Sequence, residues 1–250
     1  MKSSIVCGLA IMLSMATFAV AEPSASQEPS ASKESSASKE PSASKELSAS
    51  KESSTSKQSS AGEVAYGACA SCHGAAGQGN AALNGPALAG QSEAYLVRQL
   101  QHFKQGIRGS DPRDVYGQQM LAMVTTLGDE EAISNVASHL ASLSIKKPLA
   151  QGTESLALDL RNGANQYNGY CGACHGAKAE GNEALNAPQL AQLDAAYLKR
   201  QMQNFQQGVR GAHPKDRYGK QMAMMANTLA NEKDLDDVIG FITGVAITKR

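Results

Sequence analysis

The sequence lacks an excess of charge of either sign, because 23 Lys and Arg residues are balanced by 23 Asp and Glu residues over 250 positions. No basic face is present that would attract the phosphates of a nucleic acid. The chain also lacks a second long apolar segment, since after residue 20 no stretch is long and apolar enough to cross a bilayer. These absences argue against a nucleic-acid-binding protein and against a membrane protein with several spans.

The N-terminal region differs from the rest of the chain. Residues 1–21 have the features of a secretory signal peptide: Lys2 near the start, a mostly apolar run and the small-x-small sequence Ala19-Val20-Ala21 at the end. An uncleaved anchor is the alternative, although the apolar run is short for a span of about 20 residues. Residues 22–60 repeat a hexad of the form SASKES and are expected to be a disordered tether, because they have few large apolar side chains to bury. We therefore expect an exported, periplasmic protein.

The remaining chain contains an internal repeat. A shift of 102 residues superposes residues 67–136 on residues 169–238 without a gap, and about half of the positions are identical. This similarity predicts two copies of one small domain, at residues 61–145 and 153–250, joined by a linker at 146–152.

Each copy shows helical periodicity and lacks strand signals. Ser92 and Asp194 are placed to cap one helix, with apolar residues at helical spacing behind them. A last helix is expected after Leu127 and Leu229, and a short helix before each pair of cysteines. The segments between these helices contain Gly and Pro and are expected to be loops. A domain so small and so poor in large apolar residues lacks a self-sufficient core, so another group must fill its centre.

The strongest motif is Cys-x-x-Cys-His, which occurs once in each copy, as Cys69, Cys72 and His73 and as Cys171, Cys174 and His175. A zinc site needs four ligands, and no further histidine recurs in both copies. A redox-active dithiol is typical of a fold with strands. Covalent haem fits the motif, its duplication, export and the missing core, because two thiols bind one macrocycle and the adjacent imidazole faces the iron. The sequence predicts two covalently bound haem c groups.

On these motifs, residues 62–250 resemble the dihaem cytochromes c of the c4 type, in which two class I cytochrome c domains follow one another. The resemblance includes the stretch GQSEAYLVRQLQHFKQGIRG, which begins at residue 90. It implies an all-α fold of two domains, each built around its haem and related by pseudo-twofold symmetry. Residues 106–119 also resemble the cytochrome c portions of some terminal oxidase subunits.

The second axial ligand decides between electron transfer and an open iron that binds small molecules. Two methionine pairs recur in both copies, Met120 with Met222 and Met123 with Met225, and spacing within the chain leaves both pairs open. In the c4 type the ligand stands seven positions before the apolar residue that opens the last helix. The resemblance therefore assigns Met120 and Met222, with Met123 and Met225 packed nearby as core. A thioether ligand raises the reduction potential.

The resemblance also implies supporting residues. Pro86 and Pro188 match the proline whose carbonyl accepts a hydrogen bond from the ligand imidazole. Four further recurring residues are candidates for binding haem propionates: Arg108, Arg210, Tyr116 and Tyr218. The alternative for these four is a solvated arginine and a packed tyrosine in each copy.

These features favour an electron-transfer protein over an enzyme. The expected function is a periplasmic carrier that passes single electrons from a donor, such as a quinol-oxidising complex, to a terminal oxidase or reductase. One alternative is a dihaem enzyme of the peroxidase or thiosulfate dehydrogenase type, which would leave one iron open. Another is a haem module of an oxidase assembly, held by the tether. Membrane association is expected only through a partner or an uncleaved signal.

Overall fold

The structure is a computed structural model that describes residues 60–144 and 158–247. The expected signal peptide, the tether up to residue 59 and the linker at 146–152 lie outside these residues. The described part of the chain is all-α, as predicted, and contains isolated bridges but no strand. None of its helices has the length and apolar character needed to cross a membrane.

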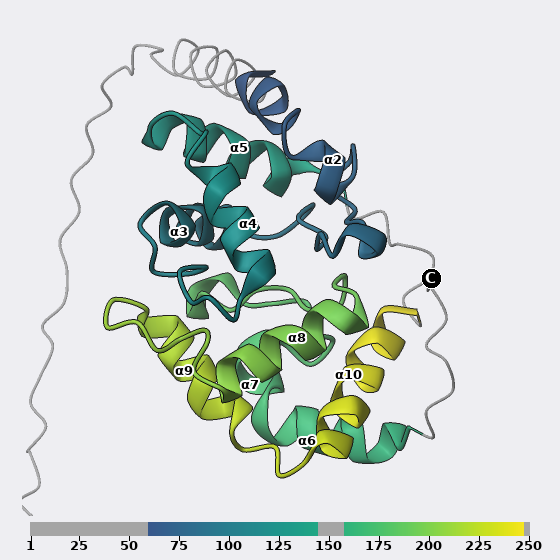
Figure 1. The fold of residues 1–250 in the computed structure, drawn as a ribbon. Helices are drawn as coiled ribbons and strands as arrows, with labels where there is room; N and C mark the ends of the chain where they lie inside the picture. Colours follow the sequence, from purple (N-terminus) through teal and green to yellow (C-terminus); the bar gives the residue numbers. More distant parts are fainter. Residues whose placement is uncertain (1–59, 145–157, 248–250) are drawn as a thin grey trace, which may run out of the picture. The chain divides into compact units, whose positions relative to one another are not determined.

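The helices of the two copies correspond to one another (Figure 1). Residues 60–66 are helical and lead to α2 (Ala70–His73), the 3-10 helix η1 (Ala81–Leu83), α3 (Glu93–Lys104), α4 (Val115–Val124) and α5 (Glu130–Ser142). The second copy contains α6 (Leu160–Tyr170), α7 (Gly172–His175), η2 (Glu183–Leu185), α8 (Ala195–Gln206), α9 (Arg217–Ala226) and α10 (Glu232–Ile247).

The expected capping residues begin the longer helices. The Ser92 hydroxyl accepts a hydrogen bond from the Tyr95 backbone N–H at 3.3 Å and starts α3, and the Asp194 carboxylate starts α8 in the same way. Asp129 caps α5 by accepting from the Ala132 N–H at 3.0 Å. A side-chain oxygen in these positions pairs a backbone N–H that has no partner inside the helix. The prediction of these helices is confirmed.

Helices α4 and α9 correct the expectation of loops between the predicted helices. Asp114 begins α4 by accepting a hydrogen bond from the Gly117 N–H at 3.0 Å, and Asp216 begins α9 by accepting from Gly219 at 2.8 Å. A Cβ at Gly117 would lie 2.1 Å from the Asp114 carboxylate. The glycine that suggested a loop is therefore the residue that lets the capping carboxylate close on the first helical turn.

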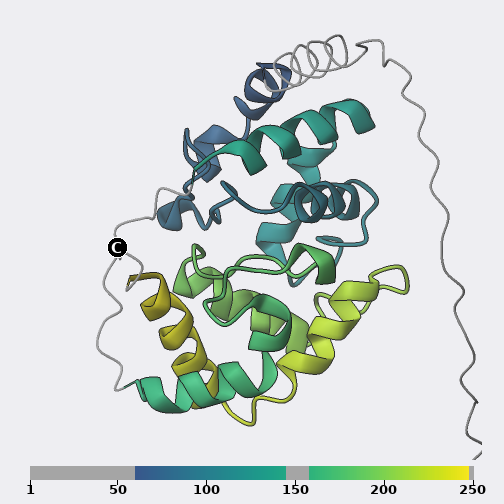
Figure 2. The same cartoon turned by 180° about the vertical axis from the view of Figure 1, so that it is seen from behind.

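Helix α3 packs on α5, and α10 packs on α6 and α8 (Figures 1 and 2). The buried apolar cluster of the first copy is small and consists of Tyr66, Leu96, Val136, Ala137 and Leu140. Helix α4, which carries Met120, contributes no residue to this cluster. The cluster therefore stabilises the side of the domain formed by α3 and α5 and leaves the region between α4 and the cysteines without an aliphatic core.

Candidate functional site

The histidine of each Cys-x-x-Cys-His motif is held in one orientation by a backbone carbonyl. His73 Nδ1 donates a hydrogen bond to the Pro86 carbonyl at 2.8 Å, and His175 Nδ1 donates to the Pro188 carbonyl at 2.9 Å. Both imidazoles are buried, and burial lowers the pKa of each, so both are neutral at physiological pH. Because Nδ1 carries the proton, Nε2 presents a free lone pair, as a metal-binding imidazole requires.

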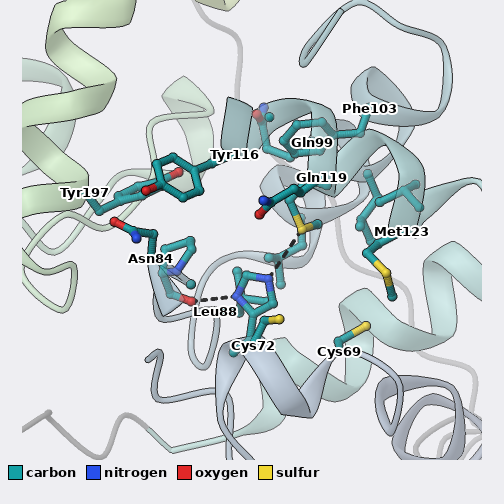
Figure 3. A pocket seen from close by; sticks show the side chains of 18 of the residues that line it. Cys69, Cys72, Asn84, Leu88, Gln99, Phe103, Tyr116, Gln119, Met123 and Tyr197 are labelled. Atoms are coloured by element: carbon teal, nitrogen blue, oxygen red, sulfur yellow. Dashed lines mark hydrogen bonds between the residues drawn. The ribbon is translucent and has the colours of Figure 1, made fainter. Parts of the chain in front are cut away.

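In the first copy, the structure brings a methionine sulfur close to the lone pair of the histidine. His73 Nε2 lies 3.5 Å from the Met120 sulfur (Figure 3). Met222 occupies the matching, half-buried position on α9. Met123 lines the same pocket as Met120 but is 44% exposed, which does not fit the core position expected for it.

A pocket surrounds the motif of the first copy (Figure 3). Cys69 and Cys72 lie on one side of it, and Gln99 and Phe103 lie on the opposite side. Apolar side chains make up most of the wall between them, including Leu83, Leu88, Leu96, Leu100 and Val124. A planar apolar group that carries polar substituents at one edge fits these surroundings.

The surroundings of the cysteines bear on the two alternative uses of the motif. Burial, followed by the charge of the neighbouring cysteine, raises the pKa of Cys69 and raises that of Cys171 to about 11. A redox-active dithiol needs a lowered pKa, because the thiolate is the reactive form. Zinc requires four ligands, and within residues 60–144 and 158–247 no three His, Cys, Asp or Glu side chains are grouped to hold a metal ion.

Two tyrosines that sequence reasoning missed hold the motif from the preceding helix. The Tyr66 hydroxyl donates to the Gly74 carbonyl at 2.6 Å, and the Tyr167 hydroxyl donates to the Gly176 carbonyl at 2.7 Å. Burial raises the pKa of Tyr66 to about 12 and also raises that of Tyr167, so both hydroxyls remain donors. Tyr66 and Tyr167 are 101 rather than 102 positions apart, so a repeat comparison that allows a one-residue gap would have found them.

The two candidate arginines make hydrogen bonds within the protein. Arg108 is 9% exposed, and Arg108 and Arg210 both donate to glutamine side chains, at 2.7 Å from Nη1 in each case. Tyr116 and Tyr218 each lie beneath an arginine of the other copy, with 4.5 Å between the guanidinium carbon and the ring centroid. Arg108 is therefore not a solvated arginine, whereas Arg210 is half-buried.

Comparison with known proteins decides the family. The family model for cytochrome c matches twice, at residues 59–144 and 160–246. Cytochrome c4 of Azotobacter vinelandii is 30% identical over 191 residues, which are 74% of this chain and 88% of that protein. The chain belongs to the cytochrome c family, as a dihaem cytochrome of the c4 type. Its two cytochrome c domains bind two covalent haem c groups.

Further similarities support this placement of the cytochrome. The crystal structure of reduced recombinant cytochrome c4 from Pseudomonas stutzeri matches with a TM-score of 0.61 and 28% identity, over 74% of this chain and 97% of that chain. A protein named thiosulfate dehydrogenase electron acceptor, from Stutzerimonas stutzeri (strain A1501), is 35% identical over 158 residues, or 61% of this chain and 69% of that protein. The cytochrome c4 likeness therefore extends to the fold of both domains.

The cap of α4 offers a stability test of the cytochrome. Asp114→Ala is expected to lower the free energy of unfolding by about 1–2 kcal/mol, because the Gly117 N–H loses its acceptor. Asp114→Asn keeps a side-chain oxygen at the cap and is expected to lose less. Denaturant unfolding of both oxidised proteins measures the difference. Equal losses would contradict the capping role and show that the charge of Asp114 matters instead.

Proposed function

We propose that this cytochrome is a periplasmic carrier that passes single electrons between two protein partners of a respiratory chain. The bound haem supplies the ferric–ferrous couple. The cytochrome c4 likeness of the whole described chain supports electron transfer as the function. The observation that carries the proposal is the approach of His73 Nε2 to the Met120 sulfur, because two protein ligands leave an iron without a position for substrate.

The proposed attachment and ligation follow the repeat. Cys69 and Cys72 bind the first haem and Cys171 and Cys174 bind the second. The axial pairs are His73 with Met120 and His175 with Met222. Each iron thus has one imidazole and one thioether ligand. The carbonyls of Pro86 and Pro188 keep the imidazole planes fixed, so that little reorganisation accompanies each electron. This closed arrangement favours a carrier over a dihaem enzyme.

The proposed partners are a quinol-oxidising complex as donor and a terminal oxidase or reductase as acceptor. Leu83, which lines the pocket of the first copy, is 52% exposed, and its counterpart Leu185 is 49% exposed. Small exposed apolar contacts at the edge of a haem pocket suit a weak and transient redox encounter. Copurification with a membrane oxidase would instead support the alternative of a permanent haem module.

A second donor is a thiosulfate-oxidising enzyme. The 35% identity to a thiosulfate dehydrogenase electron acceptor favours this candidate. Mixing the oxidised cytochrome with a thiosulfate dehydrogenase and thiosulfate should then reduce its haems, whereas thiosulfate alone should not. Reduction by thiosulfate alone would show that this chain is itself an enzyme.

The ligation has a direct spectroscopic test. The mass of the exported protein is expected to include two haems. Its oxidised form should show the weak long-wavelength absorption band of ferric haem with a methionine sulfur ligand, called the sulfur-ligation band below. Its reduced form should bind no carbon monoxide. Carbon monoxide binding to one of the two reduced haems would support the enzyme alternative. A mass equal to that of the bare polypeptide would refute haem attachment altogether.

A further inference from the structure

Four arginines, which we name the arginine cluster, join the two copies: Arg98, Arg108, Arg200 and Arg210. Arg98 donates from Nη1 and Nη2 to the side chain and the carbonyl of Asn186, at 2.8 and 2.9 Å. Arg200 donates in the same way to Asn84, at 3.0 and 3.3 Å. Because each bond runs from one copy to the other, the two contacts are related by the same 102-residue shift as the sequence.

The other two arginines meet around two glutamines. Arg108 donates to Gln99 of its own copy at 2.7 Å and to Gln201 of the other copy at 3.0 Å. Arg210 donates to Gln201 at 2.7 Å and to Gln99 at 3.0 Å. Each glutamine oxygen thus accepts from one arginine of each copy, which fixes the orientation of both guanidinium groups.

The arginine cluster has hydrogen-bonding capacity that the polypeptide does not use. The Nε atom of every member is buried and has no hydrogen-bond partner. A buried donor without an acceptor destabilises a protein, because it has lost its hydrogen bond to water. Four such donors, in matching places in both copies, indicate an acceptor that the polypeptide itself does not provide.

The arginine cluster also has more positive charge than the surrounding carboxylates neutralise. None of its members takes part in an ion pair within the described part of the chain. The acidic side chains that act on it electrostatically are Asp114, near Arg108, and Asp216, near Arg98, and both already cap helices. Four guanidinium charges against two carboxylates leave a net positive charge where Arg108 is buried and the other three arginines are half-buried. Such a charge is costly unless anions bind there.

The position of the arginine cluster indicates which anion binds. Arg108 and Arg200 both line the pocket that contains Cys69, Cys72 and His73, although they come from different copies. Arg200 lies over the rings of Tyr116 and Tyr197, with 4.5 and 5.5 Å from its guanidinium carbon to the two ring centroids. Arg98 lies over Tyr218 and Tyr95 in the corresponding way, at 4.5 and 5.4 Å.

We infer that each haem is held by arginines of both copies: Arg108 and Arg200 bind the propionates of the first haem, and Arg210 and Arg98 bind those of the second. Arg98 and Arg200 would thus complete the haem site of the opposite copy. This inference rests on the proposed haem ligation. A propionate carboxylate can accept a hydrogen bond from the unpartnered Nε–H of an arginine, and its negative charge also offsets the excess positive charge of the arginine cluster.

Reciprocal variants test the inference. A guanidinium beside a propionate offsets its negative charge, so removing it should favour the ferric form of the haem concerned. Arg200→Gln is expected to lower one of the two reduction steps by about tenfold in the ferric–ferrous equilibrium, which is 59 mV for one electron. Arg98→Gln should lower the other step by a similar amount. Spectroelectrochemical titration of the exported dihaem protein measures both.

A conservative variant and a matched control separate charge from structure. Arg200→Lys keeps the charge without the planar fork and should shift the same step less than Arg200→Gln. Arg217→Gln removes an exposed charge close to Tyr218 and should move neither step appreciably. If Arg200→Gln proves poorly folded, Arg200→Lys and Arg98→Lys replace the glutamine variants. Each should then shift a different one of the two reduction steps.

The outcomes distinguish this inference from the proposed function. Equal movement of both steps in each variant, or movement of the same step by Arg200→Gln and Arg98→Gln, would overturn the inference, because a loosened contact between the copies acts on both haems. That result, with two attached haems and an intact sulfur-ligation band, leaves the proposed function standing. Loss of the band from the unaltered protein would overturn the proposed function instead.

Discussion

Substituting Met120 with alanine is expected to lower the reduction potential of the first haem by roughly 0.2–0.4 V, within the range of about 0.8 V over which axial ligands set haem potentials. A thioether favours ferrous iron, and alanine offers no replacement for it. The variant should also bind carbon monoxide at one haem, because the iron gains an open position. Spectroelectrochemistry and a carbon monoxide difference spectrum give the two measurements.

Met123→Ala is the matched control for this prediction. Met123 lies three residues further along α4 and is 44% exposed, so its removal should leave the potential and the sulfur-ligation band nearly unchanged. Met222→Ala should reproduce the effect of Met120→Ala at the second haem. An open iron in Met123→Ala, with a closed one in Met120→Ala, would reverse the assignment within the pocket.

The parts of the site that local chemistry determines were accessible from the sequence. The Cys-x-x-Cys-His motif is contiguous, and its duplication at one spacing marks it twice. Ser92 and Asp194 begin helices because a side-chain oxygen pairs a backbone N–H only three residues away. Such short-range signals depend on few neighbouring residues and can therefore be recognised without a structure.

The roles of the glycines in helix α4 and in the helix at residues 60–66 could not be predicted from such local signals. The glycine of α4, Gly117, suggested a loop, whereas it makes room for the Asp114 cap. In the helix before the cysteines, a Cβ at Gly62 would lie 2.1 Å from the Asn135 carbonyl, and one at Gly163 would lie 2.0 Å from that of Asp237. These glycines mark close helix contacts, but their 101-residue spacing hid them from a comparison without gaps.

The contacts between the copies were beyond sequence reasoning for a different reason. Recurrence shows that Arg98 and Arg200 play the same part, but it does not say whether each serves its own copy or the other. Arg98 reaches Asn186, which is 88 positions away, and no local pattern encodes that partner. Two related surfaces that meet can exchange contacts reciprocally, and only the packed structure distinguishes this from contacts within each copy.

Removing both thiols of one motif is expected to unfold one domain. In the variant with Cys69→Ala and Cys72→Ala, the first haem is no longer attached, and the small cluster around Tyr66 and Leu140 must stabilise the domain alone. The expected loss is at least about 3–5 kcal/mol of unfolding free energy, the cost of deleting one large buried aromatic group. Limited proteolysis should then cut within residues 61–145 first and only more slowly within the second domain, which loses the contacts of the arginine cluster.

Variants with one thiol removed, and the same double substitution in the second copy, are the controls for this prediction. Cys69→Ala or Cys72→Ala alone leaves one thioether and should keep the domain folded with a smaller loss. The pair Cys171→Ala and Cys174→Ala should expose the second domain in the same way, with some loss in the first, since the arginine cluster depends on both copies. A haem-free first domain that unfolds cooperatively at the temperature of the unaltered protein would show that its polypeptide core suffices. The claim that haem replaces the missing interior would then fail.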